Sequence, residues 1–147
     1  LKERLPREKY EVDIGRALVR RDGTDVSVIT YGAMLYKALE AAKQLATNGI
    51  SVEVVNIRTI SPLDKATIIA SVKKTGKVVI VTEDHYSFGV SAELSATINE
   101  GAFEYLDGPI ERIAPPDTPI PYSPPLEDAY LPQVDEITTG ITKLVGY

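Results

Sequence analysis

The stretch Lys77–Thr82 reads KVVIVT and is the most hydrophobic run of the chain. Its consecutive β-branched residues favour a strand, because such side chains pack well on a pleated surface. A strand without polar alternation is typical of a parallel sheet that is buried on both faces. We therefore predict a central, fully buried strand at 77–82, and the elements on either side of it decide the fold.

Before this run, apolar strands alternate with helical patterns. Residues 25–31 and 51–57 are predicted strands, and the helical spacing of apolar residues predicts a helix at 32–49 between them. Ser61-Pro62 is predicted to begin the next helix, with Ser61 as the N-cap and Pro62 at the first helical position. A short strand at 17–20 is followed by Asp22-Gly23, which indicates a hairpin with the next strand.

After the run, the sequence predicts a helix at 89–100, a short strand at 109–113 and a final helix that begins at Pro132. The segment 114–132 between the last two holds seven of the ten prolines. Proline lacks a backbone donor and disrupts helix interiors, so we expect no helix in this segment.

This order of elements predicts a three-layer α/β/α domain. Right-handed crossovers place helices on both faces of a mostly parallel sheet of about five strands, and the leading hairpin adds one antiparallel edge strand. The 147 residues suit a single domain, in which we expect residues 1–15 to form an extended N-terminal linker. Ligands of such sheets bind beyond the carboxyl ends of the strands, which is where Gly32 and residues 83–89 are predicted to lie.

Composition excludes several classes of function. The net charge is −5 and no basic patch is present, so we expect no nucleic-acid partner. The absence of cysteine excludes disulfides and thiolate chemistry, and it fits a cytoplasmic location. No apolar run approaches the roughly 18 residues that a membrane helix needs, and the N-terminus lacks a signal-peptide pattern, so we expect no membrane partner.

The stretch VTEDHYSFG, residues 81–89, contains the only histidine. Asp84, His85 and Ser87 are the residue types of a hydrolase triad, but triads are normally assembled from separate loops, and no Gly-x-Ser-x-Gly pattern is present. The spacing of the acidic residues does not match that of a metal site. We therefore interpret His85 and Asp84 as parts of a structural turn at the carboxyl edge of the sheet, and the hydrolase remains an alternative.

Two further features are candidate binding surfaces. The backbone at Gly32-Ala33 begins a predicted helix and is a candidate anion site, although a tight strand-to-helix turn also explains it. The proline-rich segment carries apolar and aromatic residues, including Tyr122 and Tyr130. A stiff segment with apolar anchors loses little entropy on docking, so we expect it to contribute partly to an intermolecular interface.

Several longer stretches carry a resemblance to a known family. They are EVDIGRALVRRDGTDVSVITYGAMLYKALEAA, VEVVNIRTISPLD, SVKKTGKVVIVTE and the tail PDTPIPYSPPLEDAYLPQVDEI. In this order they resemble the C-terminal domain of the beta subunit of thiamine-diphosphate-dependent 2-oxo acid dehydrogenases, the first components of the pyruvate, branched-chain and acetoin complexes. The similarity runs from about Pro6 to the C-terminus. The short EDHY run instead resembles transketolase, whose C-terminal domain has the same architecture and is the alternative branch.

The resemblance implies a single transketolase C-terminal-like domain that assembles an enzyme without containing a complete active site. Thiamine diphosphate and magnesium would be held elsewhere in the full enzyme. The implied partners are an alpha subunit or a pyrimidine-binding domain, a lipoyl acyltransferase core, and a second copy in a homodimer. The resemblance places Asp107 and Tyr147 at the surface that docks the acyltransferase. The chain begins at Leu1 rather than methionine, so we expect a fragment; a stand-alone anion- or ligand-binding module is a further alternative.

Overall fold

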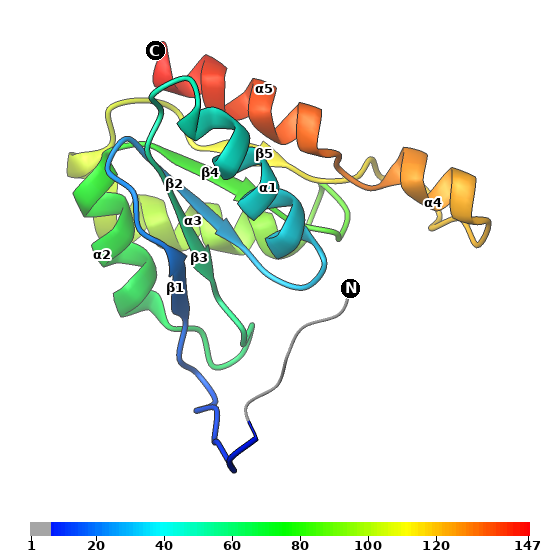
Figure 1. The fold of residues 1–147 in the computed structure, drawn as a ribbon, viewed down its shortest axis with the longest axis horizontal. Helices are drawn as coiled ribbons and strands as arrows, with labels where there is room; N and C mark the ends of the chain where they lie inside the picture. Colours follow the sequence, from blue (N-terminus) through cyan, green and yellow to red (C-terminus); the bar gives the residue numbers. More distant parts are fainter. Residues whose placement is uncertain (1–6) are drawn as a thin grey trace.

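Five strands form one sheet in the computed structural model, which describes residues 7–147 (Figure 1). The spatial order is β1-β3-β2-β4-β5, in which β1 is antiparallel to β3 and the other pairs are parallel. The predicted sheet is therefore confirmed, including its antiparallel edge strand. The strands are β1 (Leu18–Arg21), β2 (Val26–Thr30), β3 (Val52–Asn56), β4 (Val78–Val81) and β5 (Glu111–Ile113).

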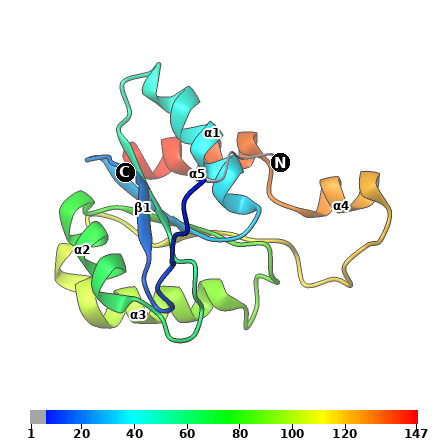
Figure 2. The ribbon, with the colours of Figure 1, turned by 60° about the horizontal axis from the view of Figure 1, so that its bottom comes forward.

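Helices cover both faces of this sheet, as predicted. Helices α1 and α5 lie on one face and α2 and α3 on the other, whereas α4 projects from the body of the domain (Figure 2). The helices are α1 (Met34–Ala46), α2 (Lys65–Thr75), α3 (Val90–Ala102), α4 (Pro124–Tyr130) and α5 (Val134–Val145), and a 3-10 turn spans Phe103–Tyr105. Within residues 7–147, no helix is long and apolar enough to cross a membrane.

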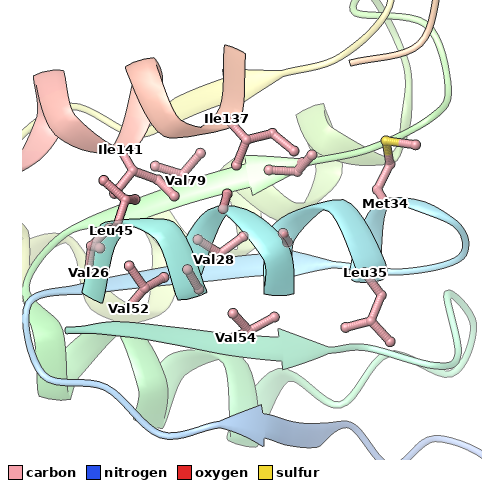
Figure 3. Close-up of a cluster of buried hydrophobic side chains, with 14 of the residues drawn as sticks. Val26, Val28, Met34, Leu35, Leu45, Val52, Val54, Val79, Ile137 and Ile141 are labelled. Carbon is pink, nitrogen blue, oxygen red and sulfur yellow. The ribbon is translucent and has the colours of Figure 1, made fainter. Parts of the chain in front are cut away.

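Two apolar cores result from the alternation of side chains along the strands. Val26 and Val28 of β2 pack toward α1 and α5, and Ile29 packs toward α2 and α3. Figure 3 shows the first core, in which Ile137 and Ile141 of α5 lie over the same sheet face as Leu45 of α1. Burial of each such side chain contributes roughly 1.5–3 kcal/mol. The sheet is thus fixed from both sides.

The position of the KVVIVT strand differs from the prediction in one respect. All four residues of β4 are buried, as expected, but the middle strand of the sheet is β2. The chain passes from β2 to β3 on one side and then crosses back to β4 on the other side. The resulting switch in direction places the carboxyl ends of β2 and β4 side by side, at the position where open α/β sheets usually bind ligands.

The predicted leading hairpin is wrong. Strand β1 pairs with β3, and β3 separates it from β2. The chain at Gly23 passes directly over the start of β3, where an added Cβ would lie 2.2 Å from the backbone nitrogen of Glu53. Glycine at this position therefore permits a close crossing rather than a two-residue hairpin turn.

Two helix predictions also need correction. Helix α2 begins at Lys65, and its N-cap is Asp64 rather than Ser61, because the Asp64 side chain accepts a hydrogen bond from the Thr67 N–H. Helix α4 lies inside the proline-rich segment that we expected to be non-helical. Pro124 and Pro125 occupy the first helical positions, where no intrahelical bond requires an N–H, so they start this helix instead of breaking it.

The predicted linker at 1–15 falls partly outside the described residues, which begin at 7. Residues 7–15 contain no helix or strand.

Candidate functional site

The predicted site residues lie at two opposite ends of the sheet. Gly32, Asp84 and His85 follow β2 and β4 at the carboxyl ends of the parallel strands. Asp107 and Tyr147 lie at the amino ends, where the Asp107 N–H donates to the carbonyl of Gly76, two residues before β4. The structure therefore presents two separate candidate sites, which we call the carboxyl-end face and the amino-end groove.

Asp84 is the centre of the turn between β4 and α3. The Tyr31 hydroxyl donates to Asp84 Oδ1 at 3.1 Å, and the Val90 N–H at the start of α3 donates to Asp84 Oδ2. Burial, followed by the charge and hydrogen bond of Asp84, raises the pKa of Tyr31 far above its usual value. Tyr31 therefore remains a neutral donor, and the Asp84 carboxylate is engaged in holding the turn, as expected for a structural residue.

His85 is held by the neighbouring loop rather than by a catalytic partner. Its Nε2 lies 2.9 Å from the carbonyl oxygen of Thr118, so this nitrogen carries a proton and donates. The ring meets that of Tyr130 edge to face, with 6.4 Å between centroids. Ser87 donates its hydroxyl to Asp117 at 2.5 Å. Among the residues that the structure describes, His85 thus lacks the hydrogen bonds that a Ser-His-Asp relay requires, and the geometry does not support the hydrolase hypothesis.

The loops after β4 and β5 are joined into one unit, the paired loops 83–89 and 114–119. The Tyr86 N–H donates to the Pro115 carbonyl at 2.9 Å, and the Ser87 N–H donates to Asp117 Oδ1 at 2.8 Å. The bonds from the Ser87 hydroxyl and N–H, aided by the charge of His85, lower the pKa of Asp117. Asp117 is therefore a stable anion, and its hydrogen bonds to Ser87 fix the turn that contains Phe88.

Phe88 is a residue that the sequence did not single out. Its φ of +58° lies in the left-handed region, which an aromatic residue rarely adopts, and its side chain is fully exposed. A groove of 610 Å³ lies beside it, lined by His85, Ser87 and residues 117–119. An exposed aromatic ring on a strained and firmly anchored turn is a feature of contact surfaces.

Gly32 occupies a tight turn that already faces a carboxylate. Its φ is +58°, and a Cβ added to it would lie 2.5 Å from Glu83 Oε1. Asp84 occupies the start of α3 in the same region. Negative charge at both positions would repel an added anion, so the geometry argues against the candidate anion site at Gly32-Ala33.

The two tyrosines of the proline-rich segment have different environments. Tyr130 is buried, whereas Tyr122 is fully exposed, together with much of Ile120 and Leu126. Leu131 packs against the core that α1 and α5 share. The end of the segment is therefore part of this domain, and its middle presents exposed apolar side chains.

The amino-end groove brings Asp107 and Tyr147 together. It has a volume of 850 Å³, and both residues line it. Gly108 lies close to the ring of Tyr147, because a Cβ added to it would lie 3.3 Å from Tyr147 Cδ1. Glu104 adds a second carboxylate, and the largely exposed ring of Phe103 also lines the groove. None of the lining residues within 7–147 is basic. The groove is thus acidic and partly apolar.

Metal binding has no evident site in the part of the chain that the structure describes. Among residues 7–147, no three His, Cys, Asp or Glu side chains are grouped so that they could hold an ion.

The fold and the two surfaces define a class of protein. It is a three-layer α/β domain in which Glu83 and Asp84 occupy the carboxyl ends of the parallel strands, and exposed apolar side chains lie around them. The family model described as the transketolase C-terminal domain matches residues 15–137. The chain belongs to the transketolase C-terminal domain family.

Within this family, the relatives confirm the resemblance inferred from the sequence. The beta subunit of the pyruvate dehydrogenase E1 component of Bacillus subtilis (strain 168) is 43% identical over 146 residues, which cover 99% of this chain and 45% of the relative. The mitochondrial subunit beta-1 of the pyruvate dehydrogenase E1 component of Arabidopsis thaliana is 50% identical over 124 residues, 84% of this chain and 34% of the relative. The chain thus spans less than half the length of these relatives.

A solved structure shows the same architecture. The split gene transketolase, described as an inactive beta4 tetramer, superposes with a TM-score of 0.80 at 26% identity, covering 93% of this chain and 43% of that one.

Proposed function

We propose that this chain is an assembly and partner-docking domain of the beta subunit of a thiamine-diphosphate-dependent 2-oxo acid dehydrogenase of the pyruvate type. The full enzyme would decarboxylate a 2-oxo acid and transfer the acyl group to lipoamide. The observation that carries the proposal is the 43% identity to a pyruvate dehydrogenase beta subunit across 99% of the chain. The absence of cysteine fits the cytoplasm as its location.

The proposal assigns thiamine diphosphate and magnesium to other parts of the full enzyme. Bound there, the cofactor would supply the carbanion chemistry of decarboxylation. Two features support this assignment: residues 7–147 contain no cluster of three ligands for the metal, and Glu83 and Asp84 place negative charge, which would repel a diphosphate, at the carboxyl ends of β2 and β4. The role of this domain is therefore to position partners, and no step of the reaction is assigned to its side chains.

The amino-end groove is the proposed docking site for the lipoyl acyltransferase core. Asp107 precedes β5 and Tyr147 follows α5, so the two residues are far apart in the sequence, but they line the same acidic, partly aromatic groove. A groove with carboxylates and exposed rings suits a partner surface that combines basic and apolar groups.

The carboxyl-end face is the proposed contact with the other parts of the enzyme, either an alpha subunit or a pyrimidine-binding domain, and with a second copy in a homodimer. Its exposed apolar side chains are supplied by separate loops and have no partner surface within the described residues. They include Ile60, Phe88, Ile120, Tyr122 and Leu126. The tetrameric state in the description of the related split gene transketolase supports self-association in this class of domain.

The docking proposal predicts that Asp107→Ala weakens binding of the acyltransferase core to the full enzyme. Removal of a charged contact at an interface typically costs about 1–3 kcal/mol of binding free energy, which raises the dissociation constant roughly 5- to 150-fold. Binding of the purified acyltransferase to the full enzyme by calorimetry or surface plasmon resonance measures this change.

Asp22→Ala is the matched control, because Asp22 is also an exposed aspartate but lies beside β1 at the opposite edge of the sheet. Circular dichroism establishes that both variants are folded. Equal affinities of wild type, Asp22→Ala and Asp107→Ala would reject Asp107 as a docking residue.

A further inference from the structure

Residues 9–14, with the sequence KYEVDI, form a segment in which apolar and charged residues alternate. We call it the leading segment. It contains no helix or strand, and Tyr10, Val12 and Ile14 are exposed by 54%, 53% and 81% of their surface. Single exposed apolar residues are normal on proteins, but three at a strict spacing of two are the pattern of a strand with one buried face.

One contact in the leading segment agrees with this pattern. Lys9 Nζ lies 3.7 Å from Glu11 Oε1, so two charged residues that are two positions apart share one side of the chain. In an extended chain, Tyr10 and Val12 would then point to the other side, and Ile14 follows in the turn with Gly15. The alternating sequence therefore gives the leading segment a charged side and an apolar side, and within residues 7–147 more than half of the surface of each apolar residue stays exposed.

The end of the leading segment is fixed to the domain. The Gly15 N–H donates to the Thr59 hydroxyl at 3.0 Å, and the Ala17 N–H donates to Asp64 Oδ2 at 3.0 Å. Gly15 has a φ of +77° and lies against Pro62, with only 2.9 Å between an added Cβ and Pro62 Cγ. The leading segment thus departs from a defined point beside the carboxyl-end face, which limits the loss of entropy when it docks.

The leading segment lies outside the family match but inside the region that is similar to a beta subunit. The family match begins at residue 15, whereas the similarity to the Bacillus beta subunit covers 99% of the chain and therefore includes residues 9–14. More than half of that relative lies outside the region that this chain matches. A second copy of the leading segment is a poor occupant, because antiparallel pairing centred on Val12 would align the apolar residues but would also place Glu11 opposite Asp13.

We infer that the leading segment is an amphipathic strap that buries Tyr10, Val12 and Ile14 against the remaining part of the same beta-type subunit. The inference rests on the proposed function, because that function supplies the remaining part. The strap would join the two parts by a packed contact and not by a free linker, so their relative orientation would be set by these three side chains.

Site-specific photo-crosslinking in the full-length protein tests this inference. The photoreactive residue p-benzoylphenylalanine replaces Val12 on the apolar side or, as a matched control one residue away, Asp13 on the charged side. The expected result is an intramolecular crosslink from position 12 to residues outside 1–147, in several-fold higher yield than from position 13. Mass spectrometry of the digested protein identifies the linked peptides, and denaturing electrophoresis separates intramolecular from intermolecular products.

Three results would overturn the strap: equal yields at both positions, a crosslink from position 12 only to residues 15–147, or a crosslink to another polypeptide. Failure of the proposed function would be distinguishable. The mass of the native polypeptide in the source cell, measured with an antibody against this chain, would then be near that of 147 residues, and no remaining part would exist. A longer native polypeptide without the expected crosslink would reject the strap alone.

Discussion

Asp84 shows how a single carboxylate can determine the state of another residue. It accepts hydrogen bonds from the Tyr31 hydroxyl and from the first amide of α3, so one side chain connects the end of β2 to the start of a helix. Its charge also opposes ionisation of Tyr31. The hydrogen bond from Tyr31 to Asp84 therefore stabilises the turn only while the phenol is protonated.

We predict that Asp84→Asn lowers the pKa of Tyr31 but leaves it above the usual value for tyrosine. Burial is the largest cause of the elevated pKa and persists in the variant, as does the charge of Glu83. Because the folded pKa of Tyr31 is raised, its contribution to stability is present below the unfolded value of about 10 and is lost as pH rises beyond it. The variant should lose less stability than wild type in alkaline solution.

Ultraviolet titration of phenolate, with Tyr31→Phe to identify the signal of this tyrosine, measures the pKa. An unchanged Tyr31 titration in Asp84→Asn would show that the contact between the two side chains does not control the phenol.

Helix α2 owes its start to residues that are distant in sequence. Asp64 caps the helix through Thr67, and it also accepts a hydrogen bond from the Ala17 N–H before β1. Burial acts to raise the pKa of Asp64, but the bonds from Ala17 and Thr67 outweigh burial and lower it. A single carboxylate thereby connects α2 to the edge of the sheet.

We predict that Asp64→Ala destabilises the domain by about 1–2 kcal/mol at neutral pH, the usual cost of losing a helix cap. Because the folded pKa of Asp64 is lowered, the contribution of its ionised form is present above the unfolded value of about 4 and is lost as pH falls through the folded value. Urea unfolding should therefore show a smaller difference between wild type and variant below pH about 3 than at neutral pH. Asp128→Ala, an exposed aspartate on α4, is the control; a difference that is independent of pH would contradict a role for the ionised carboxylate.

The elements that sequence predicts correctly are those whose signals are local. The run at β4 and the periodic apolar residues of α1, α3 and α5 need no distant partner to be recognised. The start of α2 was misplaced because Ser61 and Asp64 both satisfy the chemistry of a cap, and the distant Ala17 N–H favours Asp64. The pairing of β1 with β3 is also a long-range contact, which the Asp-Gly turn signal cannot reveal.

The same distinction applies to the candidate sites. The turn at 83–89 could be found because it contains the only histidine and follows a buried strand. Its rigidity depends on Asp117, thirty residues after Ser87, and no local pattern predicts that bond. Phe88 was missed for a related reason, because the exposure of an apolar residue depends on how both loops fold.

At the scale of the whole molecule, the two ends of the sheet have different surfaces. The amino-end groove is acidic, whereas the carboxyl-end face presents apolar side chains from several loops. An α/β sheet usually binds small molecules at its carboxyl end. In this domain, Glu83 and Asp84 occupy that position, and the surrounding loops, which present exposed apolar side chains, are the proposed contact with another protein surface.

Phe88 allows this use of the carboxyl-end face to be tested, because its backbone and its ring have separable effects. The left-handed conformation of a non-glycine residue costs roughly 1–2 kcal/mol, and the exposed ring gives no packing energy in return within the domain. We predict that Phe88→Gly raises the stability of the domain by about 1 kcal/mol, whereas Phe88→Ala, which keeps the strained backbone, does not.

Both variants should weaken association between subunits of the full-length protein, because both remove the ring. Chemical denaturation measures the first effect and sedimentation across a concentration series the second. Wild-type association in both variants would mean that Phe88 lies outside every interface, and the strain at this turn would then have no explanation in assembly.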